Sequence, residues 1–312
     1  MDNHNCLIIK PRATDYLAGD GNIPLKSNVP SGDWSTYLDF YERQRTDTYD
    51  TNGCVCFSAQ EDFDAQMEML IASGAASFLL PQFTALGYMD TGLDGQSHFH
   101  SSPRFIQIMT GNGFNGNSCQ DAWDAMRQYG ILPWKDLPFD DSVLQADYLN
   151  PPNLPALKTK ANQFIDLIGG RTITGKSANI QYHWIVNDSA NNLPAMTTSL
   201  QQAPLCLGIN VGTDWNIAQP IPPVPGGAPG HCVMNYAIDN FVEVYDHYIP
   251  VKKDLAKIWP MPYVLQGVLT ITPPVVIPPL PAPLPPQPTP TQEQTWLQKV
   301  SAWIQAILNQ LQ

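Results

Sequence analysis

The sequence predicts an α+β fold with two lobes, followed by a proline-rich arm and a terminal helix. Segments with a helical period fill much of the chain between residues 54 and 170, whereas short β-branched and aromatic runs dominate from residue 203 onward. This order favours separate helical and sheet regions over a parallel sheet of βαβ units. The end of the domain is marked by ten prolines among the eighteen positions from 273 to 290. We therefore expect a domain over 1–272, an extended linker over 273–290 and an amphipathic helix over 291–312.

The expected helices follow from apolar periodicity. Residues 1–50 look mostly irregular, apart from a short helix over 36–44. From Cys54 to near Gly74, apolar side chains recur at three- and four-residue steps and form one face of a helix. Three more helices are expected over 102–111, 117–130 and 154–170; Asn117 or Ser118 caps the second of these three and Gly130 ends it. Strands are expected over 203–212, 231–239, 240–248 and 263–272.

The charge of the chain restricts its partners. It has 312 residues with 16 basic and 28 acidic side chains, which gives a formal net charge of −12. Such a charge repels a phosphate backbone, so we expect no nucleic-acid partner. The N-terminal apolar run is too short for the core of a signal peptide, and no stretch reaches the length of a membrane span. We expect no membrane partner, no secretion by a signal peptide, and a reducing compartment.

The six cysteines are irregularly spaced, and only Cys54 and Cys56 lie close together. A metal clip, a redox pair, a disulfide or one reactive thiol beside a bystander would each explain that pair. A C-x-C pair does not easily bridge itself, and a zinc site needs a second pair of ligands at short spacing. The nearest such pair is His98 and His100, in a polar loop where we expect ordinary surface histidines. We therefore expect no metal and no cofactor.

A reactive thiol has better support. A helix N-terminus lowers the pKa of a thiol, and Cys54 follows an Asn-Gly turn at the start of its helix. A thiol nucleophile also needs a base, and the base needs an orienting group. His231 opens one expected strand and Asp246 lies near the end of the next, so a tight turn at Asp239-Asn240 can bring the two side chains together. His247 should point to the opposite face of an extended chain and is the weaker candidate for the base.

These features resemble the papain-like cysteine peptidases. The family's nucleophile opens a helix in a C-W-A-F-S pattern, which "CVCFSA" matches at Cys54, Phe57 and Ser58. The resemblance continues through "SPRFIQIMTGNGFNGNSCQDAWDAMRQYGILPWKDLPF" and closes at "GHCVMNYAIDNFVEVYDHY", covering roughly residues 30–270. It implies a helical lobe against an antiparallel sheet or barrel lobe, with Cys54 as nucleophile, His231 as base and Asp246 where the family more often has Asn. On this alignment Cys56 is a small helix residue, and Cys6, Cys119, Cys206 and Cys232 are structural.

The chain departs from the family pattern at three positions. The oxyanion-hole Gln six residues before the nucleophile is Thr48 here, and Gln44 can serve only if the intervening loop is longer. Losing such a donor typically costs on the order of a hundredfold in rate. The Trp after the nucleophile is Val55, and Tyr248 replaces the Trp that shields the family's Cys–His pair from water.

The resemblance implies hydrolysis of peptide bonds by thiol catalysis, and it is closest to divergent members of the fold encoded by bacteriophages. Acyl transfer such as cross-linking would use the same three residues. A rigid binding or structural component of a phage particle, catalytically weak or inactive and attached through its C-terminal arm, is the alternative. We expect a protein or peptide substrate and a location in the host cytoplasm or the virion.

The C-terminal segment predicts an assembly contact. Prolines hold 273–290 in an extended polyproline II conformation, and the following helix carries a seam of Leu297, Val300, Ile304, Ile307 and Leu311. Folding back on the domain would bury the seam, but self-association or docking on a larger partner is favoured. A membrane-surface helix is disfavoured because Lys299 is its only basic residue.

Overall fold

The structure is a computed structural model that describes residues 6, 16–17, 27–92, 94–187, 193–216, 219–223, 230–271 and 296–309. The chain divides into two compact units, Met1–Pro273 and Pro274–Gln312. Within the described residues the second unit contains the helix α8, Trp296–Leu308. The proline-rich linker expected over 273–290 lies outside the described residues.

A seven-stranded sheet forms one half of the first unit, in the order β1-β4-β9-β5-β6-β7-β8. Only β1 pairs in parallel, with β4; the other neighbours are antiparallel. The strands are β1 Tyr16–Leu17, β4 Ile180–Asn187, β5 Leu205–Ile209, β6 His231–Ile238, β7 Val242–Tyr245, β8 Lys252–Leu255 and β9 Tyr263–Leu269. The helix α7, Leu193–Leu200, contacts this half at β4, β5 and β6.

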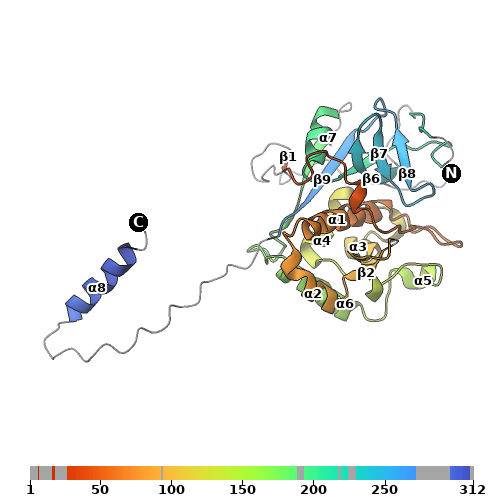
Figure 1. The fold of residues 1–312 in the computed structure, drawn as a ribbon. Coiled ribbons are helices and arrows are strands. Elements are labelled where there is room, and N and C mark those ends of the chain that lie inside the picture. The colour runs from red at the N-terminus through yellow and green to blue at the C-terminus, as the bar shows by residue number, and fades with distance from the viewer. Residues whose placement is uncertain are drawn as a thin grey trace. The chain divides into compact units, whose positions relative to one another are not determined.

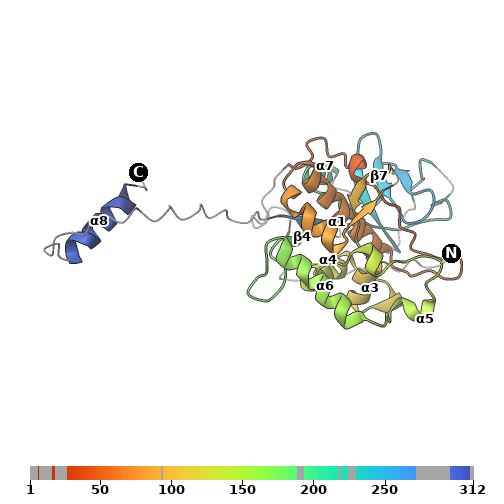
Figure 2. The same cartoon turned by 60° about the horizontal axis from the view of Figure 1, so that its bottom comes forward.

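Helices form the other half of the unit (Figures 1 and 2). They are α1 Cys54–Ala72, α2 Leu80–Leu86, α3 Pro103–Thr110, α4 Cys119–Tyr129, α5 Gln145–Tyr148 and α6 Leu154–Leu167. A small hairpin of β2, Met89–Thr91, and β3, Ser97–Phe99, belongs to this half. Short 3-10 turns lie at Ser35–Tyr37, Ser77–Leu79, Gly113–Asn115 and Trp134–Asp136.

The helix α1 lies between the two halves and is buried on all sides. It contacts β6, β9 and β5 of the sheet as well as α3 and α4 of the helical half. Every residue from Cys54 to Leu70 is buried, including four carboxylates. Three of them, Asp62, Asp64 and Glu68, have polar partners. Asp64, for example, accepts bonds from the Ser101 backbone N–H at 2.9 Å and from Gln60 Nε2 at 2.5 Å. A helix held on every face fixes the position of its first residue, Cys54.

The expected α+β class and most expected elements are confirmed. Helices α1, α3, α4 and α6 and strands β5, β6, β7 and β9 lie where the periodicity predicts them, and Ser118 caps α4 while Gly130 ends it. The helix expected over 36–44 is wrong, because only Ser35–Tyr37 forms a 3-10 turn. The sequence analysis did not predict α2, α5, α7, β4, β8 or the hairpin.

No single helix among the described residues is long and apolar enough to cross a membrane. The bent pair formed by α1 and residues Ser77–Leu86, at 100°, meets the criterion by length and composition alone. Its first member is the buried central helix of this unit.

Candidate active site

Cys54 is positioned by a tight turn that ends at the first residue of α1. Asn52 takes a positive φ of 52°, and Gly53 caps the helix. A Cβ on Gly53 would lie 2.2 Å from Oε1 of Gln107, so only glycine fits there. Gln107 in turn donates from Nε2 to the Thr51 carbonyl at 2.7 Å. The turn therefore leaves Cys54 at N1, where backbone N–H groups have no partner within the helix.

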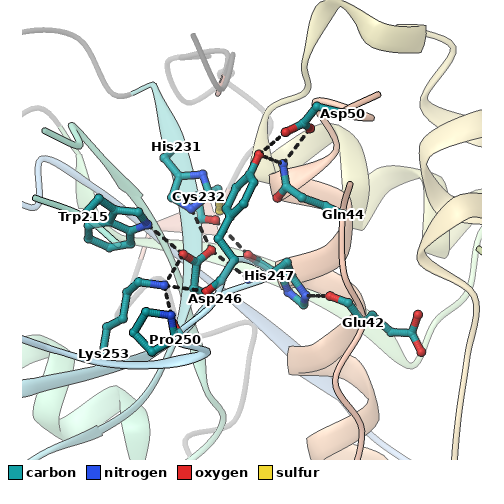
Figure 3. Close-up of polar contacts among 12 residues, drawn as sticks. Glu42, Gln44, Asp50, Trp215, His231, Cys232, Asp246, His247, Pro250 and Lys253 are labelled. Carbon is teal, nitrogen blue, oxygen red and sulfur yellow. Dashed lines mark hydrogen bonds and ion pairs between the residues drawn. The ribbon is translucent and has the colours of Figure 1, made fainter. Parts of the chain in front are cut away.

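His231 and Asp246 meet at the end of an antiparallel strand pair. His231 is the first residue of β6 and pairs with Ile209 of β5. On the return strand, β7 ends at Tyr245, so Asp246 leaves the strand. The two side chains join through His231 Nε2 and Asp246 Oδ1 at 2.8 Å, and both are fully buried (Figure 3). Because Nε2 faces the carboxylate, Nδ1 is the ring nitrogen left for proton transfer.

Asp246 collects four donors around its carboxylate. Oδ1 accepts from His231 and from the His247 backbone N–H at 2.7 Å. Oδ2 accepts from Trp215 Nε1 and from Lys253 Nζ, each at 2.7 Å (Figure 3). Burial opposes ionisation of this carboxyl, but His231 and Lys253 outweigh burial and hold its pKa well below the usual value. Asp246 is therefore an anion that orients the imidazole.

The sulfur of Cys54 lies beside the strand that carries His231. Burial raises the pKa of the Cys54 thiol well above its usual value, and the backbone N–H of Cys232, which points at the sulfur, opposes that rise. Cys232 directly follows His231, so the thiol of α1 and the start of β6 meet across the two halves of the unit. In this closed arrangement Cys54 is fully buried and its thiol is protonated.

Gln44 lies beside the same residues but is already bonded. It is fully buried, and its Nε2 donates to Tyr248 Oη at 2.7 Å and to Asp50 Oδ1 at 3.2 Å. Tyr248 also bonds Asp50 and sets its ring 5.6 Å from that of His231. Thr48, at the family's usual position for the oxyanion-hole Gln, is exposed. The amide of Gln44 therefore donates to a tyrosine hydroxyl, which occupies one of its N–H groups.

Two residues of the site were not predicted from the sequence. The ring centroid of Trp215 lies 5.6 Å from that of His231 in a T-shaped arrangement, so the indole packs beside the imidazole together with Tyr248. Tyr248, expected in place of the family's Trp, lies beside the same ring, with its centroid 5.6 Å from that of His231. Lys253 is fully buried and also donates to the Tyr248 carbonyl at 2.7 Å. The sequence around these two residues does not indicate that they belong to the site. Trp215 lies in a loop, and Lys253 lies in a Lys-Lys-Asp run that is typical of an exposed surface.

The remaining histidine candidates fall outside the triad. His247 is buried with Nδ1 at 2.7 Å from the Glu42 carbonyl, and burial lowers its pKa to about 4. His100 is buried between the rings of Phe40 and Trp134, so its expected place on the surface is wrong. His98 is partly buried and belongs to a separate cluster with carboxylates.

The other cysteines are free thiols packed in the core. Cys119 and Cys232 have their sulfurs 3.4 Å apart, and Cys206 lies 3.7 Å from Asp62. Cys56 is fully buried on α1, two residues from Cys54, and burial raises its pKa as well. Cys6 joins its backbone N–H to the Gly230 carbonyl at 3.3 Å.

A hollow of about 200 Å³ opens beside this site. Among the residues that line it are Arg43 and Arg45 from one segment of the chain and His247, Tyr248 and Ile249 from another. Tyr248 lines this hollow and also bonds Gln44.

Comparison with known proteins identifies the fold. No protein-family model and no curated protein matches the sequence. Among solved structures, xylellain, a cysteine protease from Xylella fastidiosa, has a TM-score of 0.54 at 13% identity over 86% of this chain and 96% of its own. Digestive procathepsin L 3 of Tenebrio molitor has a TM-score of 0.50 at 12% identity over 86% and 77%. The pro-form of the ragweed pollen allergen Amb a 11 has a TM-score of 0.50 at 15% identity over 81% and 67%.

The chain therefore has a papain-like fold, with α1 and the helical half set against an antiparallel sheet. At these identities the likeness extends to the fold alone. The chemistry of the site rests on its own geometry.

Proposed function

We propose that this protein is a cysteine peptidase in which Cys54 is the nucleophile, His231 the base and Asp246 the orienting group. The observation that carries the proposal is the buried His231–Asp246 bond of 2.8 Å on the strand whose next residue, Cys232, aims its N–H at the Cys54 sulfur. Nucleophile, base and orienting group come from α1, β6 and the end of β7. This is the constellation that thiol catalysis requires.

The reaction follows from the geometry. His231 Nδ1 takes the proton of Cys54 as its sulfur bonds to the substrate carbonyl carbon, and the carbonyl electron pair moves to oxygen. The oxyanion accepts from the Cys54 backbone N–H and from Gln44 Nε2. His231 then protonates the leaving amine as the C–N bond breaks, and water releases the acyl group from sulfur with His231 again as base. For Gln44 to serve, the substrate oxygen must displace the Tyr248 hydroxyl that now accepts its bond.

Hydrolysis by matched cysteine variants tests the proposal. We expect the wild-type chain to generate new carboxyl termini in a mixture of unfolded peptides, and Cys54→Ala to lose this activity by at least about a thousandfold. Peptides digested in ¹⁸O-labelled water and analysed by mass spectrometry give the rate. Cys56→Ala is the control, since it removes an equally buried thiol two residues along the same helix and should retain most of the activity. Equal rates for wild type and Cys54→Ala would refute the peptidase assignment.

A second candidate function is a catalytically weak or inactive structural component of a phage particle. The closed site favours it, because Cys54 is fully buried and the amide of Gln44 is bonded to Tyr248. The resemblance to divergent phage-encoded members of the fold supports such an origin for either function. If wild type produces no new termini in the hydrolysis assay, this second function replaces the first.

We further propose that residues 291–312 attach the protein to further copies of itself. Two apolar side chains of the predicted seam are exposed on α8, Ile304 at 46% and Ile307 at 38%. An exposed seam of this kind gains stability by pairing with another helix. Sedimentation of the full chain should give an oligomer that Ile304→Glu converts to a monomer. A wild-type monomer at micromolar concentration would contradict self-association.

A further inference from the structure

A second cluster of reactive side chains lies away from the triad, where three separate elements meet. Asp39 comes from the loop after the first 3-10 turn, Glu68 from the fourth turn of α1 and His98 from strand β3. Each offers one ligand atom, and the three atoms lie within 4.8 Å of one another. Their side chains are only 18%, 11% and 14% exposed, so the cluster is largely removed from water.

Hydrogen bonding alone does not account for the convergence. Asp39 Oδ2 lies 2.8 Å and Glu68 Oε2 lies 3.3 Å from the same ring nitrogen, Nδ1 of His98. An imidazole nitrogen carries one hydrogen or one lone pair, so it cannot bond both oxygens well. With Asp94 the cluster has three carboxylates around one imidazole, which leaves an excess of two negative charges even when the ring is protonated. A divalent cation bound to the neutral ring would reduce the three negative charges of the carboxylates to one.

The arrangement around the three atoms fits a metal ligand set. Ligands about 2.0–2.1 Å from a tetrahedral zinc lie about 3.3 Å from one another, close to the separation of His98 Nδ1 and Glu68 Oε2. The second ring nitrogen of His98 bonds Asp94 Oδ1 at 2.9 Å. A ligating histidine in proteins typically gives its other N–H to a carboxylate in this way. The other oxygen of Glu68 accepts from the Phe99 backbone N–H, which fixes the direction of the first.

We propose that Asp39, Glu68 and His98 bind a divalent transition-metal ion of the zinc class, with Asp94 orienting His98 and water completing the coordination. One nitrogen and two carboxylate oxygens suit zinc, whereas calcium and magnesium prefer ligand sets made of oxygen alone. The expectation from the sequence was that His98 is an ordinary surface residue and that the chain holds no metal. The evidence for this site does not depend on the proposed peptidase activity.

The position of the site gives the ion a structural consequence. It would tie the segment that begins at Asp39 to α1 and to the hairpin. A few residues later in that segment, Glu42 bonds the ring of His100 at 2.9 Å and, through its carbonyl, that of His247 at 2.7 Å. Gln44 lies two residues after Glu42. Metal binding would therefore brace the segment that brings Gln44 to the triad.

Titration of the full chain with zinc tests the proposal without any assay of activity. After treatment with a chelator and dialysis, wild-type protein should bind one equivalent of Zn²⁺ in calorimetry, and its melting temperature should rise with added zinc. The Co²⁺ form should show visible d–d bands without a thiolate charge-transfer band. Asp94→Asn, at a residue that is half exposed, should weaken binding about 10–100-fold, and His98→Gln should weaken it at least as much.

The core thiols provide the control, because cysteines also bind zinc. Cys119→Ala removes one of the two sulfurs that lie 3.4 Å apart and should leave zinc affinity unchanged. The proposal is overturned if wild type binds no zinc. It is also overturned if His98→Gln and Asp94→Asn bind as tightly as wild type, or if Cys119→Ala alone abolishes binding.

Discussion

Asp246→Asn should destabilise the folded protein by about 3–5 kcal/mol at neutral pH. Four donors converge on the Asp246 carboxylate, and an amide offers one acceptor oxygen in place of two. Whichever way the Asn amide turns, its NH₂ group faces donors. The ammonium of Lys253, fully buried, would also lose its only carboxylate partner in the site. Urea unfolding of wild type and variant gives the difference in free energy directly.

The buried lysine supplies the matched control for this prediction. Removing its charge in the double variant Asp246→Asn/Lys253→Met should recover about 1–3 kcal/mol relative to Asp246→Asn, since no unpaired ion then remains buried. The pKa of Asp246 is depressed in the folded state, so its contribution is fully present above the unfolded value near 4 and disappears as the pH falls below it. The difference in free energy of unfolding between wild type and Asp246→Asn should therefore become smaller only as the pH falls below about 4. If the double variant loses as much free energy of unfolding as Asp246→Asn and Lys253→Met lose together, the two buried charges do not stabilise each other, which would contradict the prediction.

His231→Ala should lower peptide hydrolysis by at least about a thousandfold. The Cys54 thiol is buried and protonated, so attack requires a base that removes its proton at neutral pH. Asp246 bonds Nε2 of His231 and so leaves Nδ1 as the ring nitrogen that would accept this proton. The rate is measured with the same peptide mixture that tests Cys54→Ala.

The combined variant provides the check on this second prediction. Residues that act as one unit lose activity together, so Cys54→Ala/His231→Ala should be no slower than either single variant. A His231→Ala protein that folds and retains more than a tenth of the wild-type rate would contradict the assignment of the base.

The start of the helix at Cys54 and the pairing of His231 with Asp246 could be predicted from the sequence because they have local signals. Cys54 follows a turn at the start of a strongly periodic helix, and His231 opens an apolar strand that is followed by a short turn and a second strand. The antiparallel register of β6 and β7, in which Ile238 lies opposite Val242, brings His231 and Asp246 to the same end of the strand pair. The confirmed α+β class follows from the change between a helical period over residues 54–170 and short strand-like runs from residue 203 onward.

The surroundings of the triad could not be predicted, because they depend on contacts between distant segments. Lys253 lies in a run that reads as solvent-exposed, and lysine is rarely buried unless it is paired. Trp215 reaches Asp246 across 31 residues, and Gln44 reaches Tyr248 across 204. The helix α1 is buried on every side, but its polar residues, such as Asp62 and Asp64, make its sequence look like that of a half-exposed helix. Its periodicity indicates one apolar face only.

The most direct test of the central claim compares two thiols on one helix. Burial raises the pKa of both Cys54 and Cys56, and the proposed function assigns His231 as base to Cys54 alone. Iodoacetamide labelling at pH 7, resolved by residue with mass spectrometry, should modify Cys54 at least about tenfold faster than Cys56, and His231→Ala should abolish that preference. If Cys54 reacts no faster than Cys56 in the wild-type protein, Cys54 and His231 do not form a catalytic pair.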